Sequence, residues 1–317
     1  MKFKLLLTST SFTDAKGEHQ DLLNEQGFEI DVMRGPLFDY ELKPIIADYD
    51  AVICGDDEYT AEILEIAKAG RLKYISKYGV GLDKIDLAKA KELGIPVTNC
   101  PGVNQVSVAE HVFALLLSFV KNIHLEHNIT KAGGWKRHVS TEIQGKTLGI
   151  VGLGAIGKEV ATRAKCFGLN IIAFEKFVNK EFLTENDYIT MVDSFEELCQ
   201  KADIISLHVP HTPETDGLIN LDIIKNKLKK GVIIINTARG KLVDLDAMIY
   251  GLDNHIIGGY LADVLDIEPM PENYELKDRE NVLITPHISS RTYESVQRQG
   301  LFAVKNLLGL LEEECKK

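Results

Sequence analysis

Three glycines that separate a short apolar run from an amphipathic stretch constrain the fold of this chain most strongly. The run Thr147–Val151 leads directly into Gly152-Leu153-Gly154-Ala155-Ile156-Gly157, and a helical pattern continues from Ala155 to Phe167. Gly152 allows a tight turn, Gly154 allows a ligand to approach the backbone, and Gly157 allows the helix to pack closely on the strand. The pattern predicts a strand–turn–helix unit whose free N–H groups at the helix start can bind a phosphate.

The sequence on both sides of this turn alternates between short β-branched runs and helical segments. In a chain of 317 residues, this alternation predicts two α/β domains with doubly wound parallel sheets. The predicted strands are Phe3–Thr8, Phe28–Met33, Ala51–Cys54, Leu72–Ser76, Pro96–Thr98, Thr147–Val151, Asn170–Phe174, Asp203–Val209, Val232–Asn236, Ile256–Val264 and Asn281–Thr285. The predicted helices include Thr60–Ala69, Lys84–Leu93, Asn104–His127, Ala155–Phe167, one that begins at the capping box Ser194–Glu197, and Thr292–Glu313.

An acidic residue follows the strand after the glycine turn. Glu175 lies 18 residues after Gly157, at the end of the predicted strand Asn170–Phe174. A carboxylate at this position can accept hydrogen bonds from the ribose hydroxyls of an adenosine and repels a 2′-phosphate. Together with the glycine turn, it predicts a dinucleotide site that prefers NAD to NADP. Lys176 leaves this preference open, because a neighbouring cation can tolerate the phosphate.

Three chemically active side chains follow the later strands, at the edge of a parallel sheet where ligands collect. They are Arg239, Glu268 and His287. A histidine can take a hydroxyl proton as a hydride leaves, and a carboxylate beside it raises the pKa of the imidazole. A guanidinium can bind a substrate carboxylate through two hydrogen bonds. Each residue alone could be an ordinary loop or surface side chain, but together they predict alcohol–ketone oxidoreduction.

The chain is acidic, and its cysteines are scattered. A formal net charge of −11 disfavours a nucleic-acid-binding surface, although a small anionic substrate could still meet local cations. The five cysteines form no CxxC pair, which favours reduced thiols and a cytoplasmic location. The apolar runs at the N-terminus and at Val112–Val120 are too short to span a membrane. His124 and His127 lack a third ligand nearby, so no metal site is expected.

Taken in order, these motifs resemble those of the D-isomer-specific 2-hydroxyacid dehydrogenase family. The resemblance covers nearly the whole chain and is carried by Gly79-Val-Gly-Leu-Asp83, Asn104 with Val108-Ala-Glu110, Trp135, the glycine turn, Thr212-Pro-Glu-Thr215, Asn236–Gly240, Glu268-Pro269 and Pro286-His287. It implies an NAD-dependent oxidoreductase that interconverts a D-2-hydroxy acid and its 2-keto acid. In such an enzyme Arg239, Glu268 and His287 are the catalytic triad.

The resemblance also implies a domain division and a set of ligand contacts. A Rossmann NAD-binding domain, residues 101–288, should be inserted in a flavodoxin-like substrate domain made of residues 1–100 and 289–317, and closure of the cleft between them would exclude water. Expected coenzyme contacts, besides the glycine turn and Glu175, are His208, Val209, Pro210, Thr215, Thr237, Ala238, Asp263 and His287. Expected substrate contacts are Lys77, Tyr78, Gly79, Val80, Gly81, Asn104, Arg137 and Arg239.

Within the family, the chain most resembles the phosphoglycerate-dehydrogenase-like branch, without the C-terminal regulatory domain of its serine-regulated members. Lys77 and Arg137 could meet a substrate phosphate, but the branch usually carries arginine at the Lys77 position, and lysine lacks the fork geometry of a guanidinium. Reduction of glyoxylate or hydroxypyruvate stays an alternative, as does a non-catalytic, NAD(H)-sensing corepressor. The resemblance further implies a homodimer, with the helix predicted at Asn104–His127 crossing into the partner.

Overall fold

The structure is a computed structural model, which describes residues 2–315 and the side chains through residue 313. The chain divides into two compact units. The first comprises Met1–Asn104 and Ser290–Lys317, and the second comprises Gln105–Ser289. The divisions lie close to those predicted at residues 100 and 288. The two ends of the predicted substrate domain, residue 1 and residues 316–317, lie outside the described residues.

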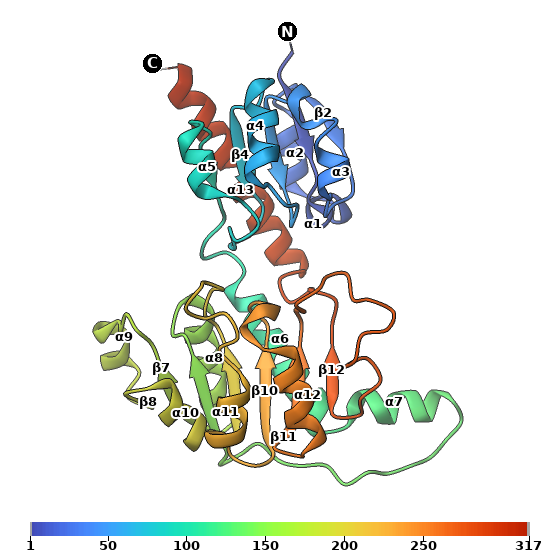
Figure 1. The fold of residues 1–317 in the computed structure, drawn as a ribbon, viewed down its shortest axis with the longest axis vertical. Helices are drawn as coiled ribbons and strands as arrows, with labels where there is room; N and C mark the ends of the chain where they lie inside the picture. The colour runs from blue at the N-terminus through green and yellow to red at the C-terminus, as the bar shows by residue number, and fades with distance from the viewer. Residues whose placement is uncertain (1, 316–317) are drawn as a thin grey trace. The chain divides into compact units, whose positions relative to one another are not determined.

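The first unit is built on a parallel sheet. Within its described residues the sheet has five strands in the order β2-β1-β3-β4-β5 (Figure 1). The strands are β1 (Lys4–Leu7), β2 (Glu29–Val32), β3 (Ala51–Cys54), β4 (Tyr74–Lys77) and β5 (Val97–Thr98). The helices are α1 (Thr10–Asp14), α2 (Glu18–Asn24), α3 (Asp39–Leu42), η1 (Ile46–Asp48), α4 (Ala61–Ala69), α5 (Leu87–Glu92) and α13 (Tyr293–Cys315).

Alternate residues of the strands in this first sheet face different helices. Leu6 of β1 packs in one core cluster with Ile63 of α4, whereas its neighbour Leu5 packs in another with Val304 of α13. All four side chains are fully buried. The period-2 alternation of strand side chains therefore places apolar residues on both faces, so that both need a helical cover.

The second unit carries a larger parallel sheet. Its described residues form seven strands in the order β12-β11-β10-β9-β6-β7-β8. The strands are β6 (Thr147–Val151), β7 (Asn170–Phe174), β8 (Ile189–Met191), β9 (Ile204–Leu207), β10 (Val232–Asn236), β11 (Ile257–Ala262) and β12 (Val282–Ile284). The helices are α6 (Gln105–Val120), α7 (Ile123–Lys131), α8 (Ala155–Cys166), α9 (Lys180–Glu185), α10 (Phe195–Lys201), α11 (Leu221–Asn226), η2 (Gly240–Leu242) and α12 (Leu245–Asp253).

Two core clusters cover the faces of the seven-stranded sheet. On one face, Leu116 of α6 and Val160 of α8 pack with Ile150 of β6. On the other face, helices α10, α11 and α12 contribute to a cluster that includes Leu198 and Met248. Sheet order and helix cover together confirm the predicted doubly wound α/β architecture.

The single long helix predicted at Asn104–His127 is wrong, because the chain breaks it after Val120. Helix α6 ends at Val120, and Asn122 adopts a left-handed φ of 56° before α7 begins. Asparagine tolerates this conformation better than most residues. The apolar stripe that suggested one helix belongs to α6. By contrast, no side chain of α7, all of whose residues the structure describes, is buried.

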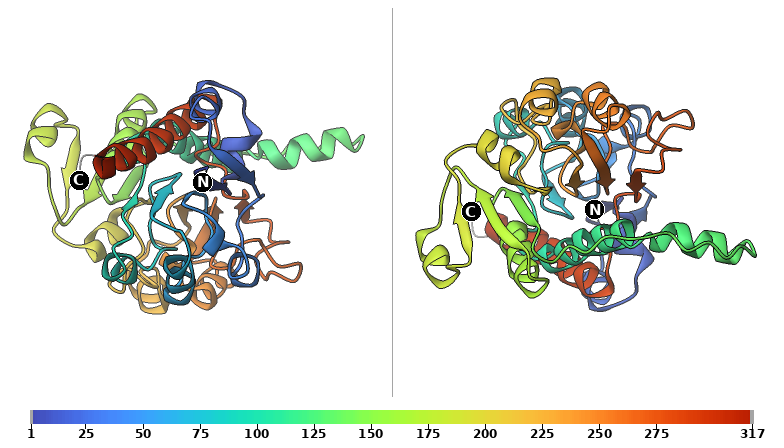
Figure 2. Two further views of the ribbon diagram at one scale, coloured as in Figure 1. Left: turned by 90° about the horizontal axis from the view of Figure 1, so that it is seen from above. Right: turned by 90° about the horizontal axis from the view of Figure 1, so that it is seen from below.

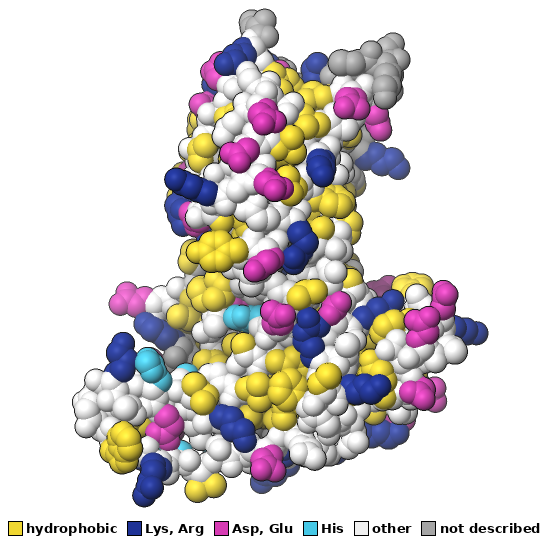
Figure 3. Space-filling view, turned by 180° about the vertical axis from the view of Figure 1, so that it is seen from behind, with side chains coloured by type: hydrophobic (Ala, Val, Ile, Leu, Met, Phe, Trp, Pro, Cys, Tyr) yellow, Lys and Arg dark blue, Asp and Glu magenta, His cyan; other side chains and the backbone are white. Residues whose placement is uncertain are grey.

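Helix α7 and the segment that returns from it extend away from the rest of the second unit (Figures 1 and 2). We call residues 123–140 the arm. Among the described residues, no single helix is long and apolar enough to cross a membrane; α6 and α7 pass that test only as a pair, by length and composition, with a 62° bend between them. On the face shown in Figure 3, lysine and arginine side chains are interspersed with aspartate and glutamate.

Smaller differences from the predicted elements have local causes. Helix α5 begins at Leu87, three residues later than predicted, because the Asp86 side chain accepts a hydrogen bond from the Lys89 amide and caps it. The predicted cap at Ser194 is present, since its hydroxyl accepts from the Glu197 amide at 3.1 Å. The short strand β8 was not predicted, because three residues are too few to show a period.

Candidate active site

The three predicted catalytic residues lie at one edge of the second unit's sheet. Strands β10, β11 and β12 are neighbours and run parallel, so their carboxyl ends share that edge. Arg239 follows β10, Glu268 follows β11 and His287 follows β12. The topology therefore brings together side chains that are far apart in the sequence.

His287 and Glu268 form a direct pair. The Nδ1 atom of His287 lies 2.8 Å from Oε2 of Glu268, and both side chains are about one-third exposed. The other carboxylate oxygen of Glu268 accepts a hydrogen bond from the Leu265 amide at 2.8 Å, which fixes its orientation. With Nδ1 directed at a carboxylate, the ring is held in the tautomer that presents Nε2 as the proton acceptor. This arrangement suits a general base.

The loop that carries His287 is held by the buried carboxylate of Asp263. Its oxygens accept hydrogen bonds from the Thr285 hydroxyl at 2.6 Å and from the amides of Ile288 and Ser289 at 2.9 and 2.7 Å. His287 itself has a left-handed φ of 52°, which is uncommon outside glycine and is found at functional sites where the surroundings enforce it. Asp263 therefore supports this backbone, and its expected contact with the coenzyme stays a prediction.

Sequence reasoning missed the partner of this carboxylate on α6. The Nε2 atom of His111 lies 2.9 Å from the Thr285 hydroxyl and 3.5 Å from Oδ1 of Asp263. Nothing local to the sequence around His111 indicates this contact, because Thr285 lies 174 residues further along the chain.

A tight turn after β10 positions Arg239. The fully buried Asn236 side chain donates to the carbonyl of Arg239 at 2.8 Å and accepts from the Ala238 amide at 3.1 Å. Gly240 follows, and a Cβ atom at this position would lie 2.0 Å from the carbonyl carbon of Leu265. Only glycine lets the Arg239 turn approach so near to the loop that holds Glu268.

The glycine turn fits a dinucleotide phosphate on the evidence of its own backbone. Gly152 has a φ of 95°, and a Cβ atom there would lie 2.7 Å from the carbonyl oxygen of His208. A Cβ atom on Gly157 would lie 2.1 Å from the carbonyl oxygen of Gly152, whereas one on Gly154 would meet nothing within 4 Å. Gly154 also supplies no side-chain cap to α8. The helix start therefore has open space and no side-chain cap from Gly154, as a phosphate site at a helix N-terminus requires.

Other predicted coenzyme residues surround this turn. Glu175 accepts hydrogen bonds from the amides of Leu153 and Phe177 at 2.8 and 2.9 Å, so its carboxylate is fixed beside the turn. The hydroxyl of Thr237 and Nδ1 of His208 are buried without a hydrogen-bond partner in the described structure. Such orphaned polar atoms at a sheet edge fit a site that a polar ligand completes.

Comparison with known proteins agrees with this geometry. Residues 113–289 match the family described as D-isomer specific 2-hydroxyacid dehydrogenase, NAD binding domain.

The chain belongs to the D-isomer-specific 2-hydroxyacid dehydrogenase family.

Individual members of this dehydrogenase family match almost the whole chain. D-3-phosphoglycerate dehydrogenase of Methanocaldococcus jannaschii is 38% identical over 98% of this chain and 58% of its own length. Hydroxypyruvate reductase of Thermotoga maritima is 38% identical over 91% of this chain and 92% of its own length. The crystal structure of Aquifex aeolicus D-lactate dehydrogenase, complexed with NAD and lactic acid, has a TM-score of 0.85 at 28% identity, covering 99% of this chain and 96% of that one.

The second unit therefore contains the family's NAD-binding domain, and the first holds most of the predicted substrate residues. Lys77 is buried, and its ammonium lies 2.8 Å from Oδ1 of Asp56 and also contacts the carbonyl of Gly55. Tyr78 is buried too, which raises the pKa of its phenol. Val80 is 40% exposed, and its carbonyl accepts from the Asn99 side chain at 2.7 Å. Lys77 is thus a buried cation that is paired with an acidic side chain.

The remaining substrate predictions lie at the end of the first unit and in the second unit. Asn104 is the last residue of the first unit before the chain enters the second. Arg137 lies exposed on the arm of the second unit. Of the histidines set aside as a metal pair, His124 instead contacts the carbonyl of Ser118 at 3.3 Å. Among the described residues, no group of three or more histidine, cysteine or acidic side chains could hold a metal ion.

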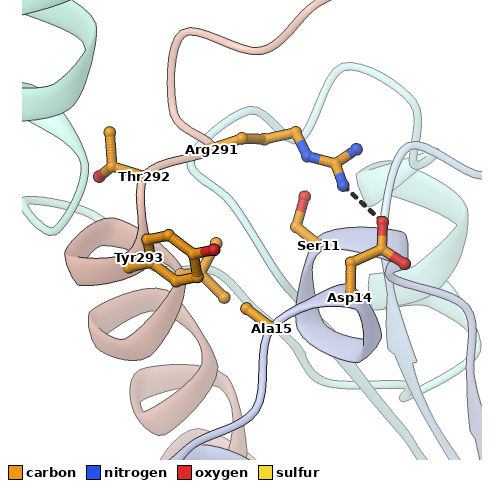
Figure 4. Close-up of a pocket in the computed structure, with 7 residues that line it drawn as sticks. Ser11, Asp14, Ala15, Arg291, Thr292 and Tyr293 are labelled. Carbon is orange, nitrogen blue, oxygen red and sulfur yellow. Dashed lines mark hydrogen bonds and ion pairs between the residues drawn. The ribbon is translucent and has the colours of Figure 1, made fainter.

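A small cavity of about 130 Å³ lies in the first unit, beside the start of α13 (Figure 4). Across it, Nη2 of Arg291 lies 2.6 Å from Oδ2 of Asp14, and Arg34 binds the same carboxylate at 2.8 Å. The hydrogen bond from Arg34 is the main cause that lowers the pKa of Asp14. The lining residues are Ser11, Asp14, Ala15, Arg291, Thr292, Tyr293 and Val296, none of which was predicted to bind substrate.

Proposed function

We propose that this chain is an NAD-dependent oxidoreductase that interconverts a D-2-hydroxy acid and its 2-keto acid. The observation that carries the proposal is the His287–Glu268 pair at 2.8 Å, on the sheet edge that also bears Arg239 and the glycine turn. Family membership supports it. The chain spans 58% and 54% of the length of two phosphoglycerate dehydrogenases that it matches. Because it covers only part of those longer proteins, their activity is a proposal for this chain.

The residues of this chain have separable tasks in the proposed reaction. In the oxidation, Nε2 of His287 takes the hydroxyl proton while the C–H bond breaks, and the carbonyl forms between the same carbon and oxygen. Glu268 stabilises the resulting imidazolium through Nδ1. The guanidinium of Arg239 binds the substrate carboxylate and polarises the adjacent oxygen. The hydride acceptor for this step would be supplied by NAD when it is bound.

Coenzyme binding is assigned to the opposite half of the same sheet edge. The amides at the start of α8 would hold the pyrophosphate, and Glu175 would accept hydrogen bonds from the adenosine ribose. Glu175 is already oriented by two backbone amides, so little ordering is needed on binding. The predicted contacts of Val209, Pro210, Thr215 and Ala238 belong to this proposal.

Replacing His287 by asparagine tests the catalytic assignment. Asparagine tolerates the left-handed backbone of this position, so the loop should keep its shape. Loss of the general base should lower kcat about 100-fold to 10,000-fold, while the Kd for NADH, from fluorescence titration, should stay within about twofold. Turnover is followed as NADH oxidation with 2-keto acids.

His255 supplies the matched control for this variant. It has a φ of 53°, but it lies between α12 and β11, at the edge of the sheet away from the catalytic loops. His255→Asn should therefore leave turnover unchanged. Wild-type turnover by His287→Asn would contradict the mechanism. An absence of turnover in the wild-type protein, with NADH bound and partner proteins recruited, would favour the corepressor class instead.

For the substrate, we propose D-3-phosphoglycerate first and hydroxypyruvate or glyoxylate second. The names of the relatives support the first. The second is favoured by the structure around Lys77, whose charge is neutralised by Asp56. The match to a hydroxypyruvate reductase, over 91% of this chain and 92% of that protein, supports it as well. A panel of phosphohydroxypyruvate, hydroxypyruvate, glyoxylate and pyruvate in the same assay ranks them by kcat/KM.

We also propose a homodimer in the cytoplasm. The arm supports the dimer, because it exposes Ile123, Trp135 and Val139 to the extent of 58%, 83% and 97%. Large apolar side chains gathered on one projecting segment are typical of a protein–protein contact. The cysteines whose side chains the structure describes, Cys54, Cys100, Cys166 and Cys199, are all free thiols, which supports a reducing compartment.

A further inference from the structure

An ion pair crosses the carboxyl edge of the second unit's sheet next to the glycine turn. Lys176 follows β7, and Glu214 lies in the loop after β9. These two strands flank β6, whose carboxyl end continues into Gly152. The ammonium of Lys176 lies 2.6 Å from Oε2 of Glu214, so the pair spans the strand that carries the turn.

The backbone on the Glu214 side is held firmly. The Thr215 hydroxyl accepts a hydrogen bond from the Thr212 amide at 2.8 Å and donates one to the carbonyl of Pro210 at 2.7 Å. The Thr215 amide donates to the carbonyl of Thr212 at 3.0 Å and closes the turn. Glu214 is therefore presented from a fixed turn, whereas the long side chain of Lys176 can adjust.

Three charged side chains therefore follow β7 and β9, at the sheet edge that carries the glycine turn. Glu175 contributes a carboxylate fixed beside the turn, and Lys176 and Glu214 contribute an ion pair. Their formal sum is one negative charge. Without Glu214 the sum would be zero, and the one cation of the group would be available to a ligand. A 2′-phosphate carries between one and two negative charges at neutral pH and would be attracted to such a cation.

We propose that Glu214 sets coenzyme specificity by pairing with Lys176 and so denying this lysine to the 2′-phosphate of NADP. This rests on the coenzyme site proposed above, where Glu175 binds the adenosine ribose. In this arrangement Glu175 repels the phosphate directly, and Glu214 removes the cation that would offset that repulsion. In the sequence alone, Lys176 left the preference between NAD and NADP open. Paired with Glu214, Lys176 no longer favours NADP.

The Lys176–Glu214 pair contributes little to the stability of the fold. Lys176 and Glu214 are 58% and 74% exposed, and exposed ion pairs contribute little to stability. Lys176 also lowers the pKa of Glu214, so the carboxylate is ionised throughout the neutral range. Removing either charge should therefore leave the protein folded, which makes the proposal testable by substitution.

The test compares NADH and NADPH binding, by fluorescence titration, in the wild type, Glu214→Gln, Lys176→Gln and the double variant. In Glu214→Gln the Kd for NADPH should fall about twofold to fivefold, the size expected for one exposed charge contact, while the Kd for NADH stays nearly constant. The gain should vanish in the double variant, because it needs Lys176. The kcat/KM ratio for the two coenzymes should move in the same direction.

Asp253→Asn is the matched control, because Asp253 also forms an exposed ion pair in this unit, with Arg279. Asp253 ends α12, before β11, and so lies at the edge of the sheet away from the glycine turn. The Asp253→Asn variant should alter neither the Kd for NADH nor the Kd for NADPH. An unchanged Kd for NADPH in Glu214→Gln, or a gain that persists in the double variant, would overturn the proposal. A wild type that binds NADH without turnover would contradict the proposed reaction but not the role of Glu214. A wild type that binds neither coenzyme would overturn both the proposed reaction and the role of Glu214.

Discussion

Individual side chains at this site mainly fix one another's orientation. Glu268 orients His287, a backbone amide orients Glu268, and the buried Asp263 holds the loop that carries the histidine. A general base needs its ring in one tautomer and one orientation before substrate binds. The sequence predicted the pair, because a histidine and a carboxylate after parallel strands indicate proton transfer. The sequence did not predict that the oxygens of Asp263 bind the loop, and the ligand contact that it predicted for this residue stays a prediction.

His208 gives a pH-dependent prediction at the same scale. Burial lowers its pKa to about 3 from a model-compound value of 6.5, so between these pH values the unfolded chain binds a proton that the folded chain does not. The neutral imidazole therefore contributes stability that is fully present above pH 6.5 and is lost as pH falls toward 3. At pH 5 the loss should reach about 2 kcal/mol.

Urea unfolding, followed by circular dichroism at pH 8 and pH 5, measures this loss. Glutamine at position 208 does not titrate, so the His208→Gln variant should lose less unfolding free energy than the wild type over the same interval. An equal pH dependence in the two proteins would show that His208 becomes protonated in the folded state.

At the scale of the elements, the loops after β10 and β11 must approach each other closely for the site to form. Gly240 permits this contact, since any side chain there would overlap Leu265. The elements themselves follow well from the sequence: β3, β6, β7 and β10 have the bounds that were predicted. The break between α6 and α7 does not follow, because a single left-handed residue leaves the apolar pattern of α6 intact.

Gly240→Ala should misplace the loop of Glu268. A Cβ atom 2.0 Å from the Leu265 carbonyl carbon forces one of the two backbones to move, and a shift of about 1 Å can cost roughly 100-fold in kcat. The control is Gly309→Ala in α13, where a Cβ atom meets nothing within 4 Å. This control should keep full activity and gain about 0.5 to 1 kcal/mol of stability from helix propensity. Similar kcat values for both variants would contradict the role of Gly240.

At the scale of the whole molecule, one unit is formed from both ends of the chain and the other from its middle. Helix α13 completes the first unit, where the Ser76 hydroxyl donates to the carbonyl of Ala303 across 227 positions of sequence. The second unit is continuous, and its exposed arm gives the whole molecule an apolar surface that a second copy can cover.

The proposed homodimer should appear in light scattering as a mass of twice 35.3 kDa. Replacing Trp135 and Val139 by serine should shift the protein toward a single chain, because both side chains lie on the exposed arm. Phe177→Ser is the control, since Phe177 is 88% exposed in the same unit but outside the arm. A wild-type mass of one chain, or equal effects of the two changes, would contradict the arm as the dimer contact.

The sequence by itself determined the periodic elements, the glycine turn and the three residue types of the site, because these depend on contacts within a few positions of the chain. Only the tertiary structure decided the order of the strands, the burial of Lys77 against Asp56 and the pairing of Lys176 with Glu214. Those features join residues 21 to 38 positions apart, or whole strands, and no local period encodes such contacts. Sheet order sets which strand ends become neighbours, and it therefore decides which charges meet beside the glycine turn.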